Sequence, residues 1–214
     1  MTLQSVIPAE ESANATTPHD SLALALRLAA PYFAVAVFWL VFHNAWLAIL
    51  AYHAQILWWS RGHFPRLMKP RPTWVMLFVL VSALAGPTLY LLLPYISHVD
   101  LSSWLARAGL SGASLAVMVF YFGLAHPFLE QSHWSSLRER TRFAHLAFAG
   151  YHMLVLYSLL TIPWLVACFA ILAGASLIWQ RMARDSGSLL PSIASHVVAD
   201  LGLVVVAWIL VVRG

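Results

Sequence analysis

Long apolar stretches alternate with short polar segments along the chain from residue 21 onward. The apolar stretches are about 20 residues long and include glycine and isolated polar residues, which is typical of transmembrane helices rather than of barrel strands. We therefore predict an all-α fold, a polytopic helical bundle in a membrane with six spans. The expected spans are residues 31–59, 73–97, 111–137, 143–161, 163–180 and 188–211.

The beginning of the bundle is the least regular part of this pattern. We expect an apolar helix at the membrane interface over residues 21–30, before the first span, and either Pro31 or the pair His43–Asn44 interrupts the apolar run. A proline or a polar pair can end a helix inside a membrane. Residues 22–59 would then form two short spans, giving seven spans in total.

The chain divides into a tail and one membrane domain. Residues 1–20 are rich in Ser, Thr, Ala, Pro and Glu and contain no Lys or Arg. They lack the basic region that starts a secretory signal, so we expect a flexible tail that is not cleaved. Residues 21–214 are expected to form a single transmembrane helical domain.

Composition excludes an ordinary soluble domain. The chain is 61% hydrophobic and 9% charged, whereas about a quarter of the residues of a soluble domain are charged. The net charge of +4 is spread over the loops between helices, and no aromatic-basic motif accompanies it. We therefore expect the lipid bilayer, and no nucleic acid, as a partner.

Basic residues predict the orientation of the bundle, because loops rich in Lys and Arg stay in the cytoplasm. Nine of the twelve basic residues fall in three loops on one side, which we expect to be cytoplasmic. Arg27, Arg107 and Arg213 are left for the opposite face. Eleven arginines to one lysine are compatible with a bacterial inner membrane. The nine residues are Arg61, Arg66, Lys69, Arg71, Arg138, Arg140, Arg142, Arg181 and Arg184.

Two carboxylates, Glu130 and Asp200, lie inside predicted spans. An ionisable side chain in the bilayer costs a few kcal/mol or more, so it usually faces a protein interior and marks function. His126 and His133 share a helix face with Glu130, and His196 precedes Asp200 by one turn. These spacings predict polar clusters on two helices.

Depth brings a third helix to the same level. Glu130 lies eight residues before the second basic loop, His152 ten residues after its last arginine, and His196 nine residues after Gly187. At about 1.5 Å per residue, all three lie roughly 12–15 Å from the basic face. We predict that they share one polar cavity.

A glutamate beside a neutral imidazole can activate a water molecule as a general base, and a second histidine can donate to a developing oxyanion. Hydrogen bonding between helices is the alternative role for such groups. We favour that role for His43, Asn44 and His53, whereas His145 is balanced between an interfacial and a catalytic role. The small residues of the fifth span, Ala167, Ala170, Gly174 and Ala175, are expected to permit close helix packing.

Three short motifs resemble those of the CAAX protease and bacteriocin-processing (CPBP) family of intramembrane proteases. His196-Val197-Val198-Ala199-Asp200 is similar to the family's HxxxN or HxxxD motif, and Phe148-Ala149-Gly150-Tyr151-His152 to its FxxxH motif. The first motif, EExxxR, is half met, with Glu130 followed by Gln131 and with Ser135 in place of the arginine. The similarity covers about residues 111–211.

The resemblance implies a glutamate-type intramembrane endopeptidase that cuts a membrane-associated protein or peptide near the cytoplasmic half of the bilayer. It implies no obligatory metal or other cofactor. Glu130 and His152 would activate the water, and His196 and Asp200 would line the oxyanion site. Arg138, one helical turn beyond Ser135, would replace the missing arginine in part. The supporting candidates are His126, Gln131, His133 and Arg138.

Two other interpretations remain open on these residues. Glu130-x-x-His133 has the carboxylate–histidine spacing of di-iron bundle sites, although a second such pair is absent from the sequence. This spacing would suit a metal- or haem-binding membrane oxidoreductase. The altered first motif is also compatible with a CPBP-like protein that binds a partner without cleaving it.

Overall fold

The computed structural model describes residues 18–60 and 74–213, and helix dominates these two ranges. The predicted tail, residues 1–20, lies almost entirely outside them, as do the four basic residues of the first predicted loop. An isolated β-bridge pairs Ser97 with Leu160. In chain order the elements are α1 (Pro18–Val35), η1 (Ala36–Val41), α2 (Ala45–Trp59), α3 (Val75–Ser82), α4 (Ala85–Ile96), α5 (Leu101–Arg107), α6 (Gly112–Phe120), η2 (Tyr121–Ala125), α7 (His126–Arg138), α8 (Phe143–Leu156), α9 (Ile162–Ser186) and α10 (Leu190–Arg213).

Within the described ranges, five helical stretches are long and apolar enough to cross a membrane. This confirms the prediction of an integral membrane bundle of α-helices. The predicted span 143–161 is a shorter apolar helix, α8, and the predicted span 163–180 is longer at its C-terminal end. The five stretches are Asp20–Val41, Met76–Ile96, Gly112–Arg138, Ile162–Ser186 and Leu190–Arg213.

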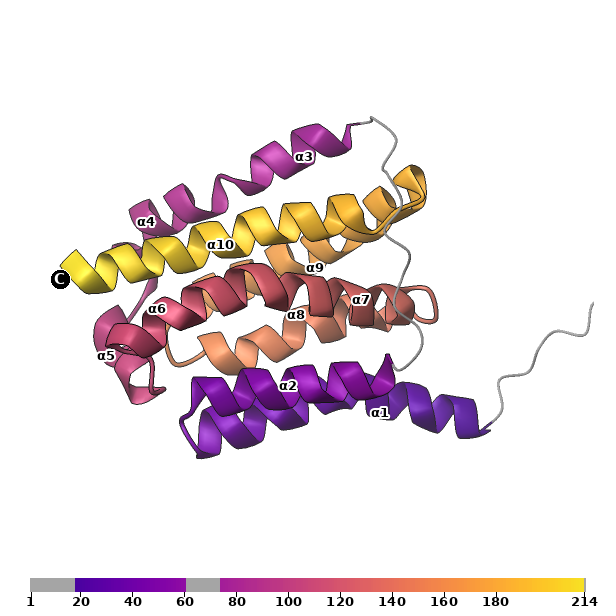
Figure 1. The fold of residues 1–214 in the computed structure, drawn as a ribbon, viewed down its shortest axis with the longest axis horizontal. Helices are drawn as coiled ribbons and strands as arrows, with labels where there is room; N and C mark the ends of the chain where they lie inside the picture. The colour runs from indigo at the N-terminus through magenta and orange to yellow at the C-terminus, as the bar shows by residue number, and fades with distance from the viewer. Residues whose placement is uncertain (1–17, 61–73, 214) are drawn as a thin grey trace, which may run out of the picture.

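The prediction of one continuous span over residues 31–59 is wrong. The chain reverses between η1 and α2, where His43 has a φ of 50°, in the left-handed region. Asn44 then caps α2 by accepting a hydrogen bond from the backbone N–H of Leu47 at 2.9 Å. The helices on either side of this turn lie side by side (Figure 1). Pro31, the other predicted break, lies inside α1.

One end of the bundle collects the start of α1, the α7–α8 turn and the α9–α10 turn (Figure 1). The turn between η1 and α2, the short helix α5 and the C-terminus lie at the other end. Arg27, which was predicted on the face opposite the basic loops, donates from Nη2 to the Ser136 hydroxyl at 2.8 Å. That prediction is wrong, because Ser136 lies two residues before the end of α7, so Arg27 adds to the basic end.

Aromatic and aliphatic side chains pack where α2, α7, α8 and α9 meet. Trp134, Leu137 and Phe148 are fully buried there, with Ile56 from α2 and Met182 from α9. Lipid is as apolar as these side chains, so close packing and interhelical hydrogen bonds hold such helices together. This contact surrounds one side of α7 and leaves its polar face directed toward α2, α8 and α10.

Glycine allows close contact between the backbones of α4 and α10. A Cβ atom at Gly86 would lie 2.7 Å from the carbonyl oxygen of Gly202, so no other residue fits without a backbone shift. At Gly174, where the sequence predicted close packing, nothing lies within 4 Å of an added Cβ. The prediction of close packing at Gly174 is therefore wrong.

These two glycines provide a matched test of the packing. We expect Gly86→Ala to lower the free energy of unfolding by about 1–3 kcal/mol, because the added methyl group overlaps backbone atoms. Gly174→Ala is expected to be neutral or to stabilise by up to about 1 kcal/mol, since alanine favours helix. Denaturant unfolding in detergent micelles, followed by tryptophan fluorescence, measures both. Equal effects of the two substitutions would contradict the α4–α10 contact.

Candidate functional site

Glu130 lies on α7 with its side chain fully buried, at 0% exposure. Its Oε1 atom accepts hydrogen bonds from the hydroxyl of Tyr52 on α2, at 2.5 Å, and from the hydroxyl of Tyr151 on α8. The Tyr52 oxygen itself accepts from the indole N–H of Trp134 at 2.7 Å. Three helices therefore hold one oxygen of this carboxylate in place.

The second oxygen of Glu130, Oε2, accepts no hydrogen bond from the described residues. Two imidazole nitrogens face it, His126 Nε2 at 3.4 Å and His196 Nε2 at 3.6 Å. His196 Nε2 also lies 3.2 Å from Asp200 Oδ2. The carboxylate thus has one oxygen fixed by hydrogen bonds and a second oxygen that faces two imidazoles.

Hydrogen bonds behind His196 determine which of its nitrogens carries the proton. Arg138 Nη1 donates to Gln131 Oε1 at 2.9 Å, and a guanidinium can only donate, so the amide of Gln131 has one possible orientation. Its Nε2 then donates to His196 Nδ1 at 3.1 Å. A neutral imidazole that accepts at Nδ1 is protonated at Nε2. His196 therefore directs an N–H toward Glu130 and Asp200.

A second chain of hydrogen bonds orients His126 in the same way. His53 Nδ1 lies 2.7 Å from the hydroxyl of Tyr121, and His53 Nε2 lies 3.0 Å from His126 Nδ1. If protons run from Tyr121 through His53 to His126, then His126 directs its Nε2–H at Glu130. With Glu130 ionised, the reverse order would place an imidazole lone pair against an oxygen that only accepts.

His152 has the opposite arrangement. Its Nδ1–H donates to the backbone carbonyl oxygen of Phe148 at 2.8 Å, so Nε2 keeps its lone pair. That nitrogen lies 3.1 Å from the Tyr151 hydroxyl, which also hydrogen-bonds Glu130. Because the hydroxyl has a single proton for two acceptors, it links His152 to the carboxylate. His152 reaches Glu130 through Tyr151, whereas His126 and His196 face it directly.

The cluster therefore combines two carboxylates, Glu130 and Asp200, with two imidazole N–H donors and one imidazole acceptor. A carboxylate and a neutral imidazole can take a proton from water, and N–H groups can stabilise a developing negative charge. The three imidazoles and one oxygen of Glu130 are held by other side chains or by backbone, so their directions are set in advance. This set of groups suits acid–base hydrolysis within a membrane domain.

The structure brings most of the predicted site residues together and leaves out one. His133 lies on a different face of α7 from Glu130, near the guanidinium groups of Arg27 and Arg138. His145, for which the sequence left an interfacial and a catalytic role open, hydrogen-bonds Ser176 and Gln180 and so joins α8 to α9. The residues in the cluster or directly behind it are His126, Glu130, Gln131, Arg138, His152, His196 and Asp200.

The carboxylate–histidine spacing of Glu130 and His133 does not produce a ligand pair. The two side chains have different neighbours, Tyr52 and Tyr151 for Glu130 and arginines for His133. In the part of the chain that the structure describes, no three or more His, Cys, Asp or Glu side chains are arranged to hold a metal ion. The geometry therefore does not favour the di-iron interpretation.

Sequence reasoning missed the aromatic residues that hold the carboxylate. Tyr52 and Tyr151 each stand next to a histidine in the sequence, and Trp134 follows Glu130 by one helical turn. Those positions are the only signal for them in the sequence. His53 was assigned to hydrogen bonding between helices, and it does join α2 to α7, but through a histidine that faces Glu130.

Comparison of the chain with protein-family models, with curated proteins and with solved structures gives no match. Function is therefore inferred from the contacts within the chain. Their common feature is that hydrogen bonds to surrounding groups orient the imidazoles next to Glu130.

Substitution of His53 tests the chain that orients His126. We expect His53→Ala to lower the free energy of unfolding by about 1–3 kcal/mol, because His126 Nδ1 loses its donor. His53→Gln keeps an N–H donor on α2 and should recover part of this loss. Unfolding in micelles measures stability, and ¹⁵N spectra of labelled histidine report the tautomer of His126. If alanine and glutamine have the same effect on both readouts, the proposed orientation is wrong.

Proposed function

We propose that this protein is a glutamate-type intramembrane endopeptidase of the CPBP type, acting on a membrane-associated protein or peptide. The observation that carries the proposal is the position of Glu130 Oε2, between His126 Nε2 at 3.4 Å and His196 Nε2 at 3.6 Å, inside a buried part of the bundle. A carboxylate oxygen with this surrounding is suited to bind and activate a water molecule.

In the proposed reaction, a water at Glu130 Oε2 attacks the carbonyl carbon of the scissile peptide bond. Its proton passes to the carboxylate, with His152 Nε2 as a second acceptor linked through Tyr151. The carbonyl oxygen gains negative charge and accepts hydrogen bonds from N–H donors, of which His196 Nε2–H is the best oriented. The proton then moves to the leaving nitrogen as the carbon–nitrogen bond breaks, giving a carboxylate and an amine.

The altered first motif supports this arrangement of His196. Gln131, in place of the family's second glutamate, holds His196 by its Nδ1 atom. Ser135 supplies no guanidinium, but Arg138 reaches back along α7 to Gln131. We therefore assign to Gln131 and Arg138 the role that the second glutamate and the arginine of the EExxxR motif have in the family.

The basic end of the bundle is assigned to the cytoplasm, in a bacterial inner membrane. Loops rich in arginine stay on that side, and the contact of Arg27 with Ser136 adds one more basic residue to it. Glu130 lies eight residues from the end of α7, so cleavage would occur in the cytoplasmic half of the bilayer. Because Glu130 is fully buried, a peptide bond can reach it only if neighbouring helices separate.

Substitution of Glu130 or His152 tests the proposed reaction. New peptide termini should appear in membranes that contain the wild-type protein, and Glu130→Gln or His152→Ala should reduce them by about 10²-fold or more, because each removes a proton acceptor. Mass spectrometry of labelled termini measures them. Asp185→Asn is the control, since this carboxylate pairs with Arg181 at the end of α9, away from the cluster.

Helical circular dichroism and unfolding must show that each variant is folded. Wild-type levels of the same termini from the Glu130→Gln protein would defeat the peptidase proposal. Loss of termini in all three variants, including Asp185→Asn, would show only that the bundle is disturbed.

A further inference from the structure

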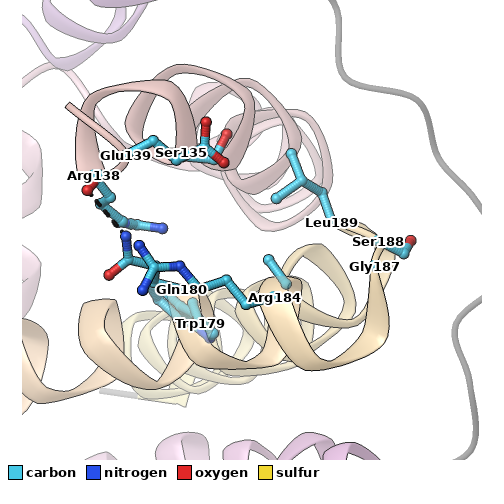
Figure 2. A pocket seen from close by; sticks show the side chains of 10 residues that line it. Ser135, Arg138, Glu139, Trp179, Gln180, Arg184, Gly187, Ser188 and Leu189 are labelled. Carbon is cyan, nitrogen blue, oxygen red and sulfur yellow. Dashed lines mark hydrogen bonds between the residues drawn. The ribbon is translucent and has the colours of Figure 1, made fainter. Parts of the chain in front are cut away.

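A cavity of about 210 Å³ opens at the basic end of the bundle, between the end of α7 and the α9–α10 turn. Figure 2 shows Arg138 entering it from α7 and Arg184 from α9, with Glu139 and Gln180 also in its wall. The proposed reaction does not use this space. Trp179 lies between the cavity and the candidate site. It lines the cavity, and its ring stacks on the His196 ring with 4.3 Å between the ring centroids.

Arg138 is a buried charged group that forms no ion pair within 4.0 Å in the described ranges, although Glu130 attracts it from further away. Arg138 is 4% exposed, and only its Nη1 atom has a hydrogen-bond acceptor, Gln131 Oε1. Its Nε and Nη2 atoms have no hydrogen-bond partner in the described ranges. The ring of Phe148, 5.4 Å from Cζ, offers a cation–π contact but no counter-charge. A buried charge is costly unless it is paired and hydrogen-bonded.

Arg184 brings a second guanidinium to the same space. Both Arg184 and Arg138 line this cavity (Figure 2). Among the described residues, neither arginine has a carboxylate within 4.0 Å, the limit for an ion pair, whereas the neighbouring Arg181 pairs with Asp185 at 2.8 Å. The cavity therefore has two guanidinium groups in its wall, and an anion inside it would lie beside both positive charges.

We propose that this cavity binds a phosphate group. Guanidinium groups donate in a planar fork that matches phosphate oxygens, and a phosphate has enough oxygens to accept from two forks at once. A volume of about 210 Å³ equals that of about seven liquid waters, which is enough for a phosphate and its first ester atoms. Glu139, the one carboxylate in the wall, is exposed to solvent, which screens its repulsion.

The phosphate has two possible sources, the headgroup of an anionic lipid and the free ion. The cavity lies at the end of three spans, where lipid headgroups meet the protein, and basic pockets between helices at this level suit such headgroups. Gln180 shapes the cavity wall by donating from Nε2 to the backbone carbonyl oxygen of Arg138 at 3.0 Å. The site is thus built from α7 and α9 together.

Binding can be measured on the full chain without any cleavage. One arm incorporates the purified protein into phosphatidylcholine nanodiscs with or without phosphatidylglycerol and counts retained lipid by native mass spectrometry. The other arm titrates inorganic phosphate in a phosphate-free detergent solution. Arg184→Gln should weaken binding about tenfold or more, as expected for loss of a charge-assisted hydrogen bond. Arg181→Gln, on the same helix but outside the cavity, should leave it unchanged.

Retention of phosphatidylglycerol that depends on Arg184 would identify a headgroup site, and binding of inorganic phosphate with the same dependence would identify a site for the free ion. The proposal is overturned if neither ligand binds, or if Arg181→Gln weakens binding as much as Arg184→Gln. Arg184 is exposed, so its variant should fold; Arg138→Gln is a second variant in which binding should be lost. Failure here leaves the peptidase proposal untouched, since no catalysis is measured.

Discussion

The buried carboxylate of Glu130 is the constraint on which the centre of this bundle depends. A charge in this position is costly unless hydrogen bonds compensate it. Tyr52 from α2 and Tyr151 from α8 supply those bonds to one oxygen, so the same contacts that satisfy the carboxylate also join three helices. Trp134 extends the arrangement by donating to Tyr52, which ties the aromatic core to the polar site. Stability and the position of the reactive group are therefore set by one network.

The same network gives chemically similar side chains different roles. His126 and His196 each accept at Nδ1 and direct an N–H toward Glu130, while His152 donates from Nδ1 and keeps a lone pair at Nε2. A reaction that removes a proton from water and stabilises an oxyanion needs both kinds of imidazole. The proposed peptidase activity is supported by this division, which depends on groups outside the cluster such as Arg138 and the backbone at Phe148.

Arg138 connects the proposed site to the proposed phosphate cavity. One of its nitrogens holds Gln131, and through it His196, while the other two lack acceptors. An anion in the cavity would fix the guanidinium that orients His196. The two proposals are nevertheless tested by different measurements, the proposed phosphate binding at Arg184 and the proposed hydrolysis at Glu130.

Much of the architecture follows from the sequence alone. The length of the apolar stretches predicted membrane-spanning helices. The depth of Glu130, His152 and His196 relative to the basic loops predicted that three helices bring polar groups to one level, because the rise per residue is constant in a helix.

The direction in which a side chain points from its helix, and the neighbouring helix that it meets, do not follow from spacing alone. The sequence could not show that His133 faces arginines while His126 faces Glu130, that Arg27 lies beside Ser136, or that Gly86 and not Gly174 marks a close contact. Nor could it show that two tyrosines hold the carboxylate, since a hydroxyl becomes a partner only when packing places it within hydrogen-bond distance. Spacing along the chain decided which groups share a level in the membrane, and only packing between helices decided which of them touch.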